Sequence, residues 1–374
     1  MRICFWGDVA GALKGSTPGG SELQISLLAK LLVKYGHEVI VIDYTILKGF
    51  TTIDGVKVIP IKGWNGGIRI LRTFTHRFPQ LYKTLIKQEA DIYYCRIRDF
   101  RHLITYWAAR KVNAKFVYAL ADGLDELKFS DRCKYEYFTN IGWVWWFFNI
   151  LFSEIIHPVL LRKSDFVFAQ HGGQKKSLLG KGIQSSIINN LIDITNLQVK
   201  NAEQSDFVCV GSLAKNKGLV KLYEIIKKTP EYTYKIVGQP RDKTGFRYYE
   251  KFKSMQNVSL LGRLDHENTL LQIMNSKALI STSSIEGFPN IFLEAWACGI
   301  PVLSLYVNPG NILIHENIGY FADGNIEKLL HFMAIVNSDE TLSDRAKVYI
   351  DQNHIINDQK IEEIGALFTS IGSH

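Results

Sequence analysis

Short apolar runs alternate with amphipathic stretches along the chain, which predicts strands joined by helices. Leucines at helical spacing between positions 23 and 32 predict a first helix, and Ser21 followed by Gln24 has the spacing of a capping box at its start, after a loop over 7–20. Further helices are predicted over 69–88 and 100–111. In the N-terminal half of the chain, strands are predicted over Arg2–Trp6, Glu38–Asp43, Asp91–Cys95, Lys115–Leu120, Asp165–Ala169 and Ser186–Asn189.

A second series of apolar runs follows a polar, patternless segment over 195–205, which we interpret as a linker. Strands alternating with helices are typical of a parallel sheet covered by helices on both faces. The chain is therefore predicted to be an α/β protein with two doubly wound, Rossmann-like domains. Strands of the second domain are expected over Asp206–Val210, Thr233–Val237, Asn257–Leu261, Lys277–Ser281 and Pro301–Leu305.

The stretch from Ser281 to Leu305 predicts a strand end, a tight loop, a short helix over 290–298 and another strand. Pro289 is expected at the first helical position, where its missing N–H costs nothing, and Gly299 is expected to end the helix in the left-handed conformation. The helix N-terminus then opens at the carboxyl end of a strand. Open α/β sheets bind ligands there, and the free N–H groups of a helix start suit phosphate.

Two carboxylates flank this predicted phosphate site. Glu286 lies in the loop, and Glu294 lies one turn inside the helix on the same face as Asn290. Ionised carboxylates accept hydrogen bonds and sugar hydroxyls donate them, so a nucleotide sugar would suit the arrangement, with the ribose at one Glu and the transferred sugar at the other. A surface loop with a Glu near a helix start is the structural alternative.

The sequence EGFPNIFLEAWACGIPV, with its E-x7-E spacing, resembles the donor-site signature of glycosyltransferase family 4, whose members are retaining enzymes of GT-B fold. This resemblance implies that Glu294 holds the ribose hydroxyls and that Glu286 contacts the donor sugar. It also implies that backbone N–H groups at the helix start face the phosphates. The donor-binding residues expected in this segment are Glu286, Gly287, Phe288, Asn290, Ile291 and Glu294.

The segment GGSE followed by LLAKLLVKYGHEVIV also resembles the opening of family 4 chains. There the Gly-Gly loop faces the donor phosphates, which implies this role for Gly19 and Gly20; a simple turn is the alternative. The GT-B fold implies that residues 1–194 form the acceptor-binding domain and residues 195–356 the donor-binding domain, the two facing a central cleft. The final helix, within 357–374, is then expected to pack back on the first domain.

The segment after the strand 206–210 resembles the family pattern G-R-L-x-x-x-K-G, whose Arg and Lys clamp the diphosphate. Lys217 matches the pattern, and a solvated lysine near a helix start is its structural alternative. Ser212 stands where the Arg is usual and supplies a hydrogen bond without charge. Arg263 is our first candidate for the missing cation.

The first domain of this family commonly offers a His to the reacting sugar, and here Asp122 takes that position. Asp122 could bind the donor sugar, help to position the acceptor, or simply cap the next helix. His171 is a further cleft candidate, although a lone histidine is more often structural. No D-x-D motif occurs, so we expect no metal, with the nucleotide sugar as co-substrate and Lys217 and the helix start neutralising the diphosphate.

The net charge of +8 is unevenly distributed: residues 1–190 hold 26 Lys+Arg and 15 Asp+Glu (+11), whereas residues 191–374 hold 18 and 21 (−3). This asymmetry argues against a uniformly basic nucleic-acid binder and allows the basic half to face an anionic membrane. The aromatic run Ile141–Phe152 is too short to span a bilayer. It is expected either in the core of the first domain, or as an interfacial helix or part of an apolar acceptor groove.

Five scattered cysteines without a C-x-x-C motif suggest reduced thiols, and the start of the chain does not resemble a signal peptide. We therefore expect a cytoplasmic protein, with possible peripheral contact on the inner face of the membrane. The expected function is a retaining hexosyltransferase that moves a sugar from a nucleotide diphosphate sugar, such as a UDP-sugar, to a glycan or lipid-linked acceptor in cell-surface polysaccharide or glycoconjugate synthesis. A nucleotide-sugar epimerase of the same fold and a non-catalytic binding protein are the alternatives.

Overall fold

The computed structural model describes residues 1–16, 19–45, 51–68, 72–96, 98–121, 123, 151–193, 204–336 and 341–373, with the backbone alone at 153 and 154. The chain divides into two compact units, which we treat separately. The N-terminal unit comprises Met1–Ala121, Asp125–Leu191 and Ile356–His374, and the C-terminal unit comprises Asp122–Leu124 and Ile192–Ile355. The division at Leu191 falls three residues before the boundary predicted from the sequence.

The N-terminal unit is built on an eight-stranded sheet with the order β3-β4-β2-β1-β5-β6-β7-β8. All neighbouring strands are parallel except for the hairpin of β3 and β4, which the sequence pattern did not predict. The order reverses direction between β1 and β5, so ligands are expected beyond the carboxyl ends of these two strands. The strands are β1 (Arg2–Gly7), β2 (Glu38–Asp43), β3 (Thr51–Ile53), β4 (Val56–Pro60), β5 (Ile92–Cys95), β6 (Lys115–Ala119), β7 (Phe166–Ala169) and β8 (Ser186–Ile187).

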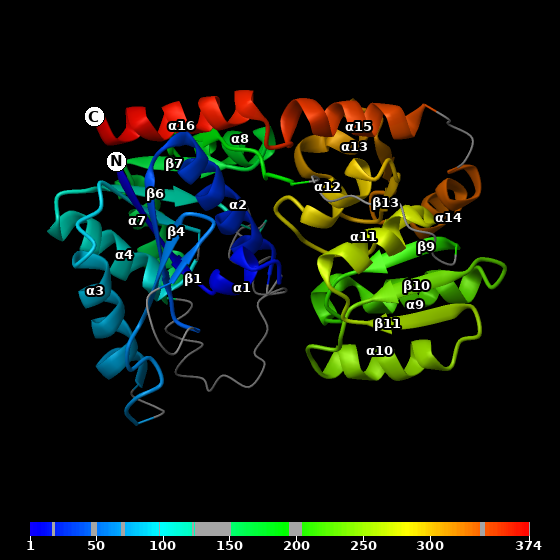
Figure 1. Cartoon of the computed structure of the whole chain (residues 1–374). Helices are drawn as coiled ribbons and strands as arrows, with labels where there is room; N and C mark the ends of the chain where they lie inside the picture. The colour runs from blue at the N-terminus through cyan, green and yellow to red at the C-terminus, as the bar shows by residue number, and fades with distance from the viewer. Residues whose placement is uncertain are drawn as a thin grey trace. The chain divides into compact units, whose positions relative to one another are not determined.

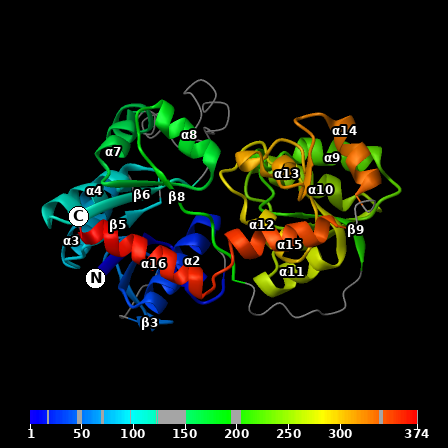
Figure 2. The same ribbon diagram turned by 90° about the horizontal axis from the view of Figure 1, so that it is seen from above.

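Helices cover both faces of this sheet because successive strand residues point to opposite sides. Ile3 and Phe5 of β1 pack with α2 and α16, whereas Cys4 and Trp6 pack with α3, α4 and α8. The C-terminal helix α16, drawn in red, lies alongside α2 in both views (Figures 1 and 2). The helices are α1 (Ala10–Leu13), α2 (Gly20–Tyr35), the π-helical turn η1 (Thr73–Arg77), α3 (Phe78–Ile86), α4 (Phe100–Lys111), the π-helical turn η3 (Phe152–Ile156), α7 (His157–Lys163), α8 (Gly172–Gly180) and α16 (Asp358–Ser373).

The start of α2 differs from the predicted capping box. Gly19 is the N-cap residue, in an extended conformation, so Ser21 already lies inside the helix. Gln24 does not cap either; its buried side chain donates to the Leu191 carbonyl at 2.8 Å and accepts from the Leu191 N–H at 2.7 Å. The side chain therefore ties α2 to the end of the unit. The predicted loop before α2 also contains a short helix, α1.

The C-terminal unit contains a six-stranded parallel sheet with the order β11-β10-β9-β12-β13-β14. This order reverses between β9 and β12, which makes their carboxyl ends the expected ligand position. Ser205, which the sequence placed in the linker, is the first residue of β9 and pairs with Ser276. The strands are β9 (Ser205–Val210), β10 (Tyr234–Val237), β11 (Val258–Gly262), β12 (Ser276–Ser281), β13 (Val302–Ser304) and β14 (Gly319–Phe321).

Helices again form a layer on each face of the second sheet. Phe207 and Cys209 pack with α9, α10 and α14, whereas Val208 packs with α11, α12 and α15. Figure 2 shows these two layers on opposite sides of the strands. The helices are the 3-10 turn η4 (Lys215–Lys217), α9 (Leu219–Lys228), α10 (Lys243–Lys253), α11 (His266–Met274), α12 (Asn290–Ala297), the 3-10 turn η5 (Pro309–Asn311), α13 (Ile312–His315), α14 (Ile326–Ile335) and α15 (Leu342–Asn353).

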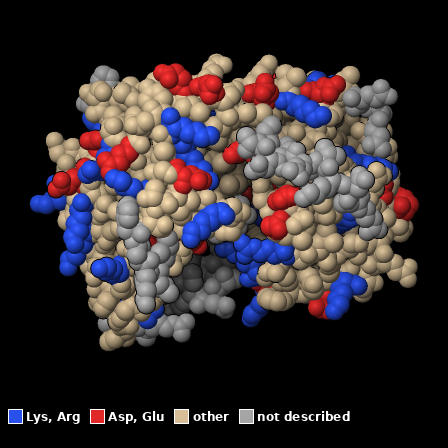
Figure 3. All heavy atoms as spheres, in the orientation of Figure 1, with Lys and Arg blue, Asp and Glu red and all other residues tan. Residues whose placement is uncertain are grey.

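The distribution of surface charge and the position of the aromatic run Ile141–Phe152 are relevant to the predicted contact with an anionic membrane. On the face drawn in Figure 3, basic and acidic side chains are interspersed with neutral ones. Residues 141–150 of the aromatic run lie outside the described residues, whereas Phe152 is buried and its ring centroid is 5.0 Å from that of Phe100. Within the described parts of the chain, no helix combines the length and apolarity that crossing a bilayer requires.

Candidate active site

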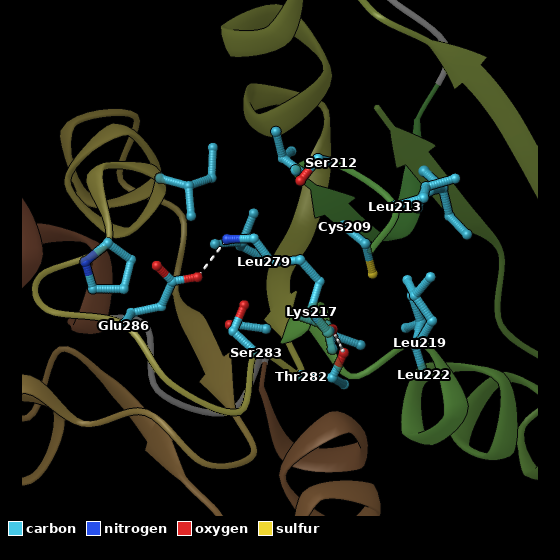
Figure 4. A pocket seen from close by; sticks show the side chains of 17 residues that line it. Cys209, Ser212, Leu213, Lys217, Leu219, Leu222, Leu279, Thr282, Ser283 and Glu286 are labelled. Atoms are coloured by element: carbon cyan, nitrogen blue, oxygen red, sulfur yellow. Dashed lines mark hydrogen bonds and ion pairs between the residues drawn. The ribbon is translucent and has the colours of Figure 1, made fainter. Parts of the chain in front are cut away.

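A pocket opens at the carboxyl ends of β9 and β12, where the order of the second sheet reverses. Its wall comes from the residues after β9, from η4 and α9, and from the loop between β12 and α12 (Figure 4). The pocket has a volume of ≈ 50 Å³, which is between one and two times the volume of about 30 Å³ that a water molecule occupies in the liquid. A nucleotide sugar could therefore place only one part in this pocket and must extend beyond it. Polar side chains in the wall include Ser212, Lys217, Ser281, Thr282, Ser283 and Glu286.

Lys217 and Glu286 form an ion pair within this pocket. The Nζ atom of Lys217 donates to Oε1 of Glu286, and Figure 4 shows the two side chains pointing toward each other. The side chains are 29% and 23% exposed, so water reaches both groups. Such a partly exposed pair is worth little to stability, which makes it available for exchange with a charged ligand. The sequence motifs identified each residue, and the fold brings them together.

The backbone around Lys217 is fixed to the loop that carries Glu286. The Thr282 hydroxyl donates to the Lys217 carbonyl at 2.8 Å, and the Ser284 N–H donates to the Asn216 carbonyl at 2.9 Å. Gly218 follows with φ of 66°, and a Cβ at this position would lie 1.9 Å from the Thr282 carbonyl oxygen. Only glycine permits this approach. This close contact between Gly218 and Thr282 therefore fixes the position of the Lys217 backbone, from which the Lys217 side chain extends into the pocket.

Helix α12 begins beside the pocket. Pro289 is its N-cap residue with ψ of 120°, so it lies just before the first helical residue, Asn290, and not at the first helical position as predicted. Proline has no side-chain oxygen, so it cannot cap the first N–H groups. The ring of Phe288 is buried against Trp296 and His354, with centroids 6.4 and 5.2 Å away, and this packing anchors the loop. The helix start is thus held in place with its positive end toward the pocket loop.

Glu294 lies on α12 and its side chain contacts α11 rather than the pocket. Its Oε1 is 3.4 Å from Nε2 of His266, the first residue of α11. This hydrogen bond outweighs burial and raises the pKa of His266, with further contributions from Asp193 and Asp265. Glu294 is only 8% exposed. A carboxylate that is nearly buried and shared with one histidine keeps acceptor capacity for a ligand hydroxyl.

The predicted donor residues fall into several groups. Ser212, Lys217, Glu286 and Ile291 line the pocket together. Four further residues of the C-terminal unit, Arg263, Gly287, Phe288 and Asn290, are not among the described residues that line it. Arg263 is exposed after β11. Gly19 and Gly20 start α2 in the N-terminal unit, and Asp122 lies outside the described residues.

Sequence reasoning missed His266, Thr282 and Ser283. The Ser-Thr-Ser-Ser run that begins at Ser281, the last residue of β12, was the available signal for the latter two, because ligands bind at the carboxyl ends of the strands in open α/β sheets. His266 gave no such signal, since it follows an ordinary N-cap residue, Asp265. Another candidate, His171, is the N-cap of α8, where its ring nitrogen accepts from the Gln174 N–H at 3.4 Å.

Cys209 also lines the pocket, and burial raises the pKa of its thiol to about 12. The thiol is therefore protonated at neutral pH and is unsuited to nucleophilic chemistry. Across the described residues, no three His, Cys, Asp or Glu side chains gather as a set of metal ligands. The groups available for chemistry in the pocket are thus a cation, a carboxylate, hydroxyls and a helix start.

Comparison with known proteins relates this geometry to a family. Residues 193–352 match the family described as glycosyl transferases group 1. Over 327 residues the chain is 23% identical to one component of the human phosphatidylinositol N-acetylglucosaminyltransferase, a match that covers 83% of this chain and 64% of that protein. The chain thus spans less than two thirds of this relative's length.

The solved structures show the fold. Sucrose-phosphate synthase from Thermosynechococcus elongatus has a TM-score of 0.77 at 14% identity, covering 100% of this chain and 99% of that one. UDP-GlcNAc 2-epimerase from Methanocaldococcus jannaschii has a TM-score of 0.59 at 15% identity, with 99% and 100% coverage. The two-domain GT-B fold predicted from the sequence is confirmed. The match over 193–352 likewise bears out the predicted resemblance, and this part of the chain is similar to the glycosyl transferases group 1.

Proposed function

We propose that the protein is a retaining hexosyltransferase that uses a nucleotide diphosphate sugar, in the first instance a UDP-sugar, and a glycan or lipid-linked acceptor. The observation that carries this proposal is the ion pair of Lys217 and Glu286 in a pocket beside the start of α12. The family of residues 193–352 and the name of the human relative support sugar transfer over epimerisation or simple binding. The proposed setting is the synthesis of cell-surface polysaccharides or glycoconjugates.

In the proposed reaction, the bond between the anomeric carbon and the β-phosphate oxygen breaks, and the acceptor oxygen forms the new glycosidic bond. The acceptor hydroxyl loses its proton to water, and the nucleoside diphosphate leaves with the electron pair of the broken bond as added negative charge. Lys217 would exchange Glu286 for the diphosphate, and the start of α12 would add its N–H groups. Stabilisation of this developing charge is the main catalytic contribution expected of the pocket.

Glu286 and Glu294 would each accept hydrogen bonds from the hydroxyls of a different sugar ring of the donor. Glu286, released from Lys217, would accept hydrogen bonds from the transferred sugar. Glu294, about one helical turn away from the pocket loop and next to α11, would accept from the ribose hydroxyls. Ser212 would bind a phosphate oxygen, with Arg263 as the proposed second cation.

The N-terminal unit would bind the acceptor and complete the donor site. Gly19 and Gly20 would present backbone N–H groups to the donor phosphates, and Asp122 would contact the reacting sugar or the acceptor. We further propose that the chain works without a divalent metal, because Lys217 and the helix start already provide positive charge for the diphosphate. Loss of activity with a chelator and its recovery with manganese would contradict this.

A ligand panel followed by product analysis tests the proposal. UDP, GDP, ADP and their glucose, galactose and N-acetylglucosamine derivatives are added in a thermal-shift assay, in which a ligand at 100 times its Kd stabilises the folded state by about 2.7 kcal/mol. The ligand that raises Tm is then incubated with a lipid-linked or glycan acceptor, and the anomeric proton of the product is followed by NMR. A retained configuration is expected. An inverted product, or a new nucleotide sugar formed without acceptor, would overturn the proposal.

A further inference from the structure

A second pocket, of ≈ 220 Å³, lies entirely within the N-terminal unit. At about 30 Å³ per water molecule, this space holds roughly seven waters, enough for a hexose-sized group. Its wall comes from the segment after β4 and from the start of α4, which follows β5. The pocket is therefore close to the carboxyl ends of the sheet, as expected for a ligand site in this fold. The residues that matter below are Trp64, Arg77, Phe78, Asp99, Phe100 and Arg101.

Arg101 is oriented and already paired. Its Nε donates to Oδ2 of Asp99 at 2.7 Å, and its Cζ lies 4.8 Å from the ring centroid of the buried Trp6. Burial opposes the charge of the guanidinium, but Asp99 more than compensates and raises the pKa of Arg101. Arg101 is thus a permanent cation with a fixed planar face. Its charge is largely balanced by the single carboxylate in the wall.

Arg77 is held in the same pocket by neutral partners. Its Nε donates to the Trp64 carbonyl at 3.2 Å, its Nη2 donates to Oδ1 of Asn65 at 3.2 Å, and its Cζ lies 5.2 Å from the Trp64 ring centroid. Among the described residues, no carboxylate lies within ion-pair distance of Arg77. Burial together with the nearby charges of Arg72 and Arg101 lowers the pKa of Arg77. Positive charge in this region therefore exceeds negative charge.

Aromatic rings form the rest of the wall. Trp64 stacks on Tyr44 with centroids 5.1 Å apart and an interplanar angle of 19°, which fixes its ring. Phe78 and Phe100 lie 6.3 Å apart and are both half-buried. Rings held in this way offer apolar surface to the C–H face of a sugar, while an arginine fork matches the oxygens of a phosphate in two parallel hydrogen bonds.

We infer that this pocket binds a phosphate carried on a sugar ring, as the recognised part of the acceptor. The inference rests on the proposed transfer reaction, in which the N-terminal unit takes the acceptor. Arg77 supplies the cation for the phosphate, Arg101 adds a second one, and the rings of Trp64 and Phe78 contact the sugar. Asp99 orients Arg101 and accepts from a sugar hydroxyl. A neutral sugar lacks the group that Arg77 needs, and free phosphate lacks the ring.

Isothermal titration calorimetry of the full chain with glucose 6-phosphate, with glucose and with inorganic phosphate tests this inference. We expect glucose 6-phosphate to bind at least about tenfold more tightly than either glucose or phosphate, because only it engages both the arginine and the rings. Arg77→Gln should weaken glucose 6-phosphate binding by about tenfold or more. Lys83→Gln removes the same charge from an exposed position on α3 outside the pocket and should leave the affinity within about twofold.

Two further measurements distinguish a failure of this inference from a failure of the proposed donor site. Thr73→Glu places a carboxylate in the pocket wall without removing Arg77, and it should also abolish binding of glucose 6-phosphate. Titration with UDP reports on the C-terminal unit and should be unchanged in Arg77→Gln. If UDP binds but glucose 6-phosphate binds no better than glucose, or Thr73→Glu binds it normally, the inference is wrong while the transferase proposal stands. If glucose 6-phosphate binds as expected and UDP does not, the donor assignment fails instead.

Discussion

Lys217 and Glu286, 69 positions apart in the sequence, form an ion pair in a pocket where β9 and β12 are adjacent strands. The pair places side by side the groups that, in the proposed function, bind a phosphate and a sugar hydroxyl. In the absence of donor each neutralises the other, so neither charge is left uncompensated in the half-buried wall. Donor binding would then substitute one charged partner for another, which limits the cost of desolvating the lysine.

Lys217→Ala is expected to lower kcat by about 10²–10³-fold, because the leaving diphosphate loses its nearest cation. Nucleotide affinity should fall less, since the start of α12 remains. Steady-state kinetics with the donor found in the ligand panel measures both effects. Lys221→Ala, which removes a lysine of α9 that pairs with Glu224, is the matched control and should behave like wild type. Equal kinetics in both variants would refute the role of Lys217.

The two carboxylates should be separable by mutation. Glu294→Ala is expected to weaken nucleotide binding, because each ribose hydroxyl that loses a charged acceptor forfeits about 1.5–3 kcal/mol. Glu286→Ala is expected to reduce turnover more than affinity, because Glu286 contacts the transferred sugar in the proposed donor complex. Titration with the nucleotide and kinetics with the full donor distinguish the two effects. A pattern with the roles reversed would mean that the donor lies in the opposite direction along α12.

Gly218→Ala should destabilise the C-terminal unit and misplace Lys217. A residue with a side chain loses about 1–2 kcal/mol in the left-handed conformation, and its Cβ would also clash with the Thr282 carbonyl. Gly262→Ala is a close control, because Gly262 has φ of 67° but nothing lies within 4 Å of an added Cβ. Urea unfolding of both variants isolates the clash. A loss of stability no larger in Gly218→Ala than in Gly262→Ala would show that the loop adapts.

The pair of His266 and Glu294 should make stability depend on pH. Glu294 raises the pKa of His266 in the folded state above its usual value of about 6.5. Protonated His266 therefore contributes stability that is fully present below about pH 6.5 and is lost as pH rises through the folded-state pKa. From about pH 6 to mildly alkaline pH, the stability difference between wild type and His266→Gln should shrink as the pH rises.

Urea midpoints measured across this range provide the check on His266. The acidic groups Glu294, Asp193 and Asp265 all favour the protonated ring, so the sign of the effect is not ambiguous. His331→Gln, which replaces an exposed histidine of α14, controls for the loss of a surface histidine. A difference that grows with pH in His266→Gln would contradict the assigned pair.

Binding to anionic vesicles is expected if the acceptor is lipid-linked. Residues 1–190 carry a net charge of +11, and each basic residue near an anionic leaflet contributes about 1 kcal/mol that salt screens. Co-sedimentation should therefore require anionic lipid and weaken from low to high salt. Protein that stays in the supernatant with anionic vesicles at low salt would rule out this contact. A water-soluble glycan would then be the preferred acceptor.

Much of the fold follows from local sequence signals. The alternation of apolar runs and helical patterns predicted most strands of both sheets to within a residue or two, but it missed the short hairpin of β3 and β4 and the edge strand β14. The loop, the helix and the glycine that ends it, over 286–299, also follow from local signals. Gly299 has φ of 72°, a conformation that glycine adopts at little cost, so a glycine at this position predicts the end of the helix. Such signals act over a few residues, so they are present in the sequence itself.

Side-chain partners were decided by the tertiary structure. Gln24 has the spacing of a capping box, yet it bonds Leu191, 167 positions away, because the helix starts two residues earlier than predicted and the buried amide finds a backbone partner at Leu191. The sequence alone pointed to Lys217, Glu286 and Glu294 as site residues. It did not show that Lys217 pairs with Glu286 while Glu294 faces His266. These choices depend on which strands and helices become neighbours, and that order is set by the packing of both sheets rather than by any local stretch.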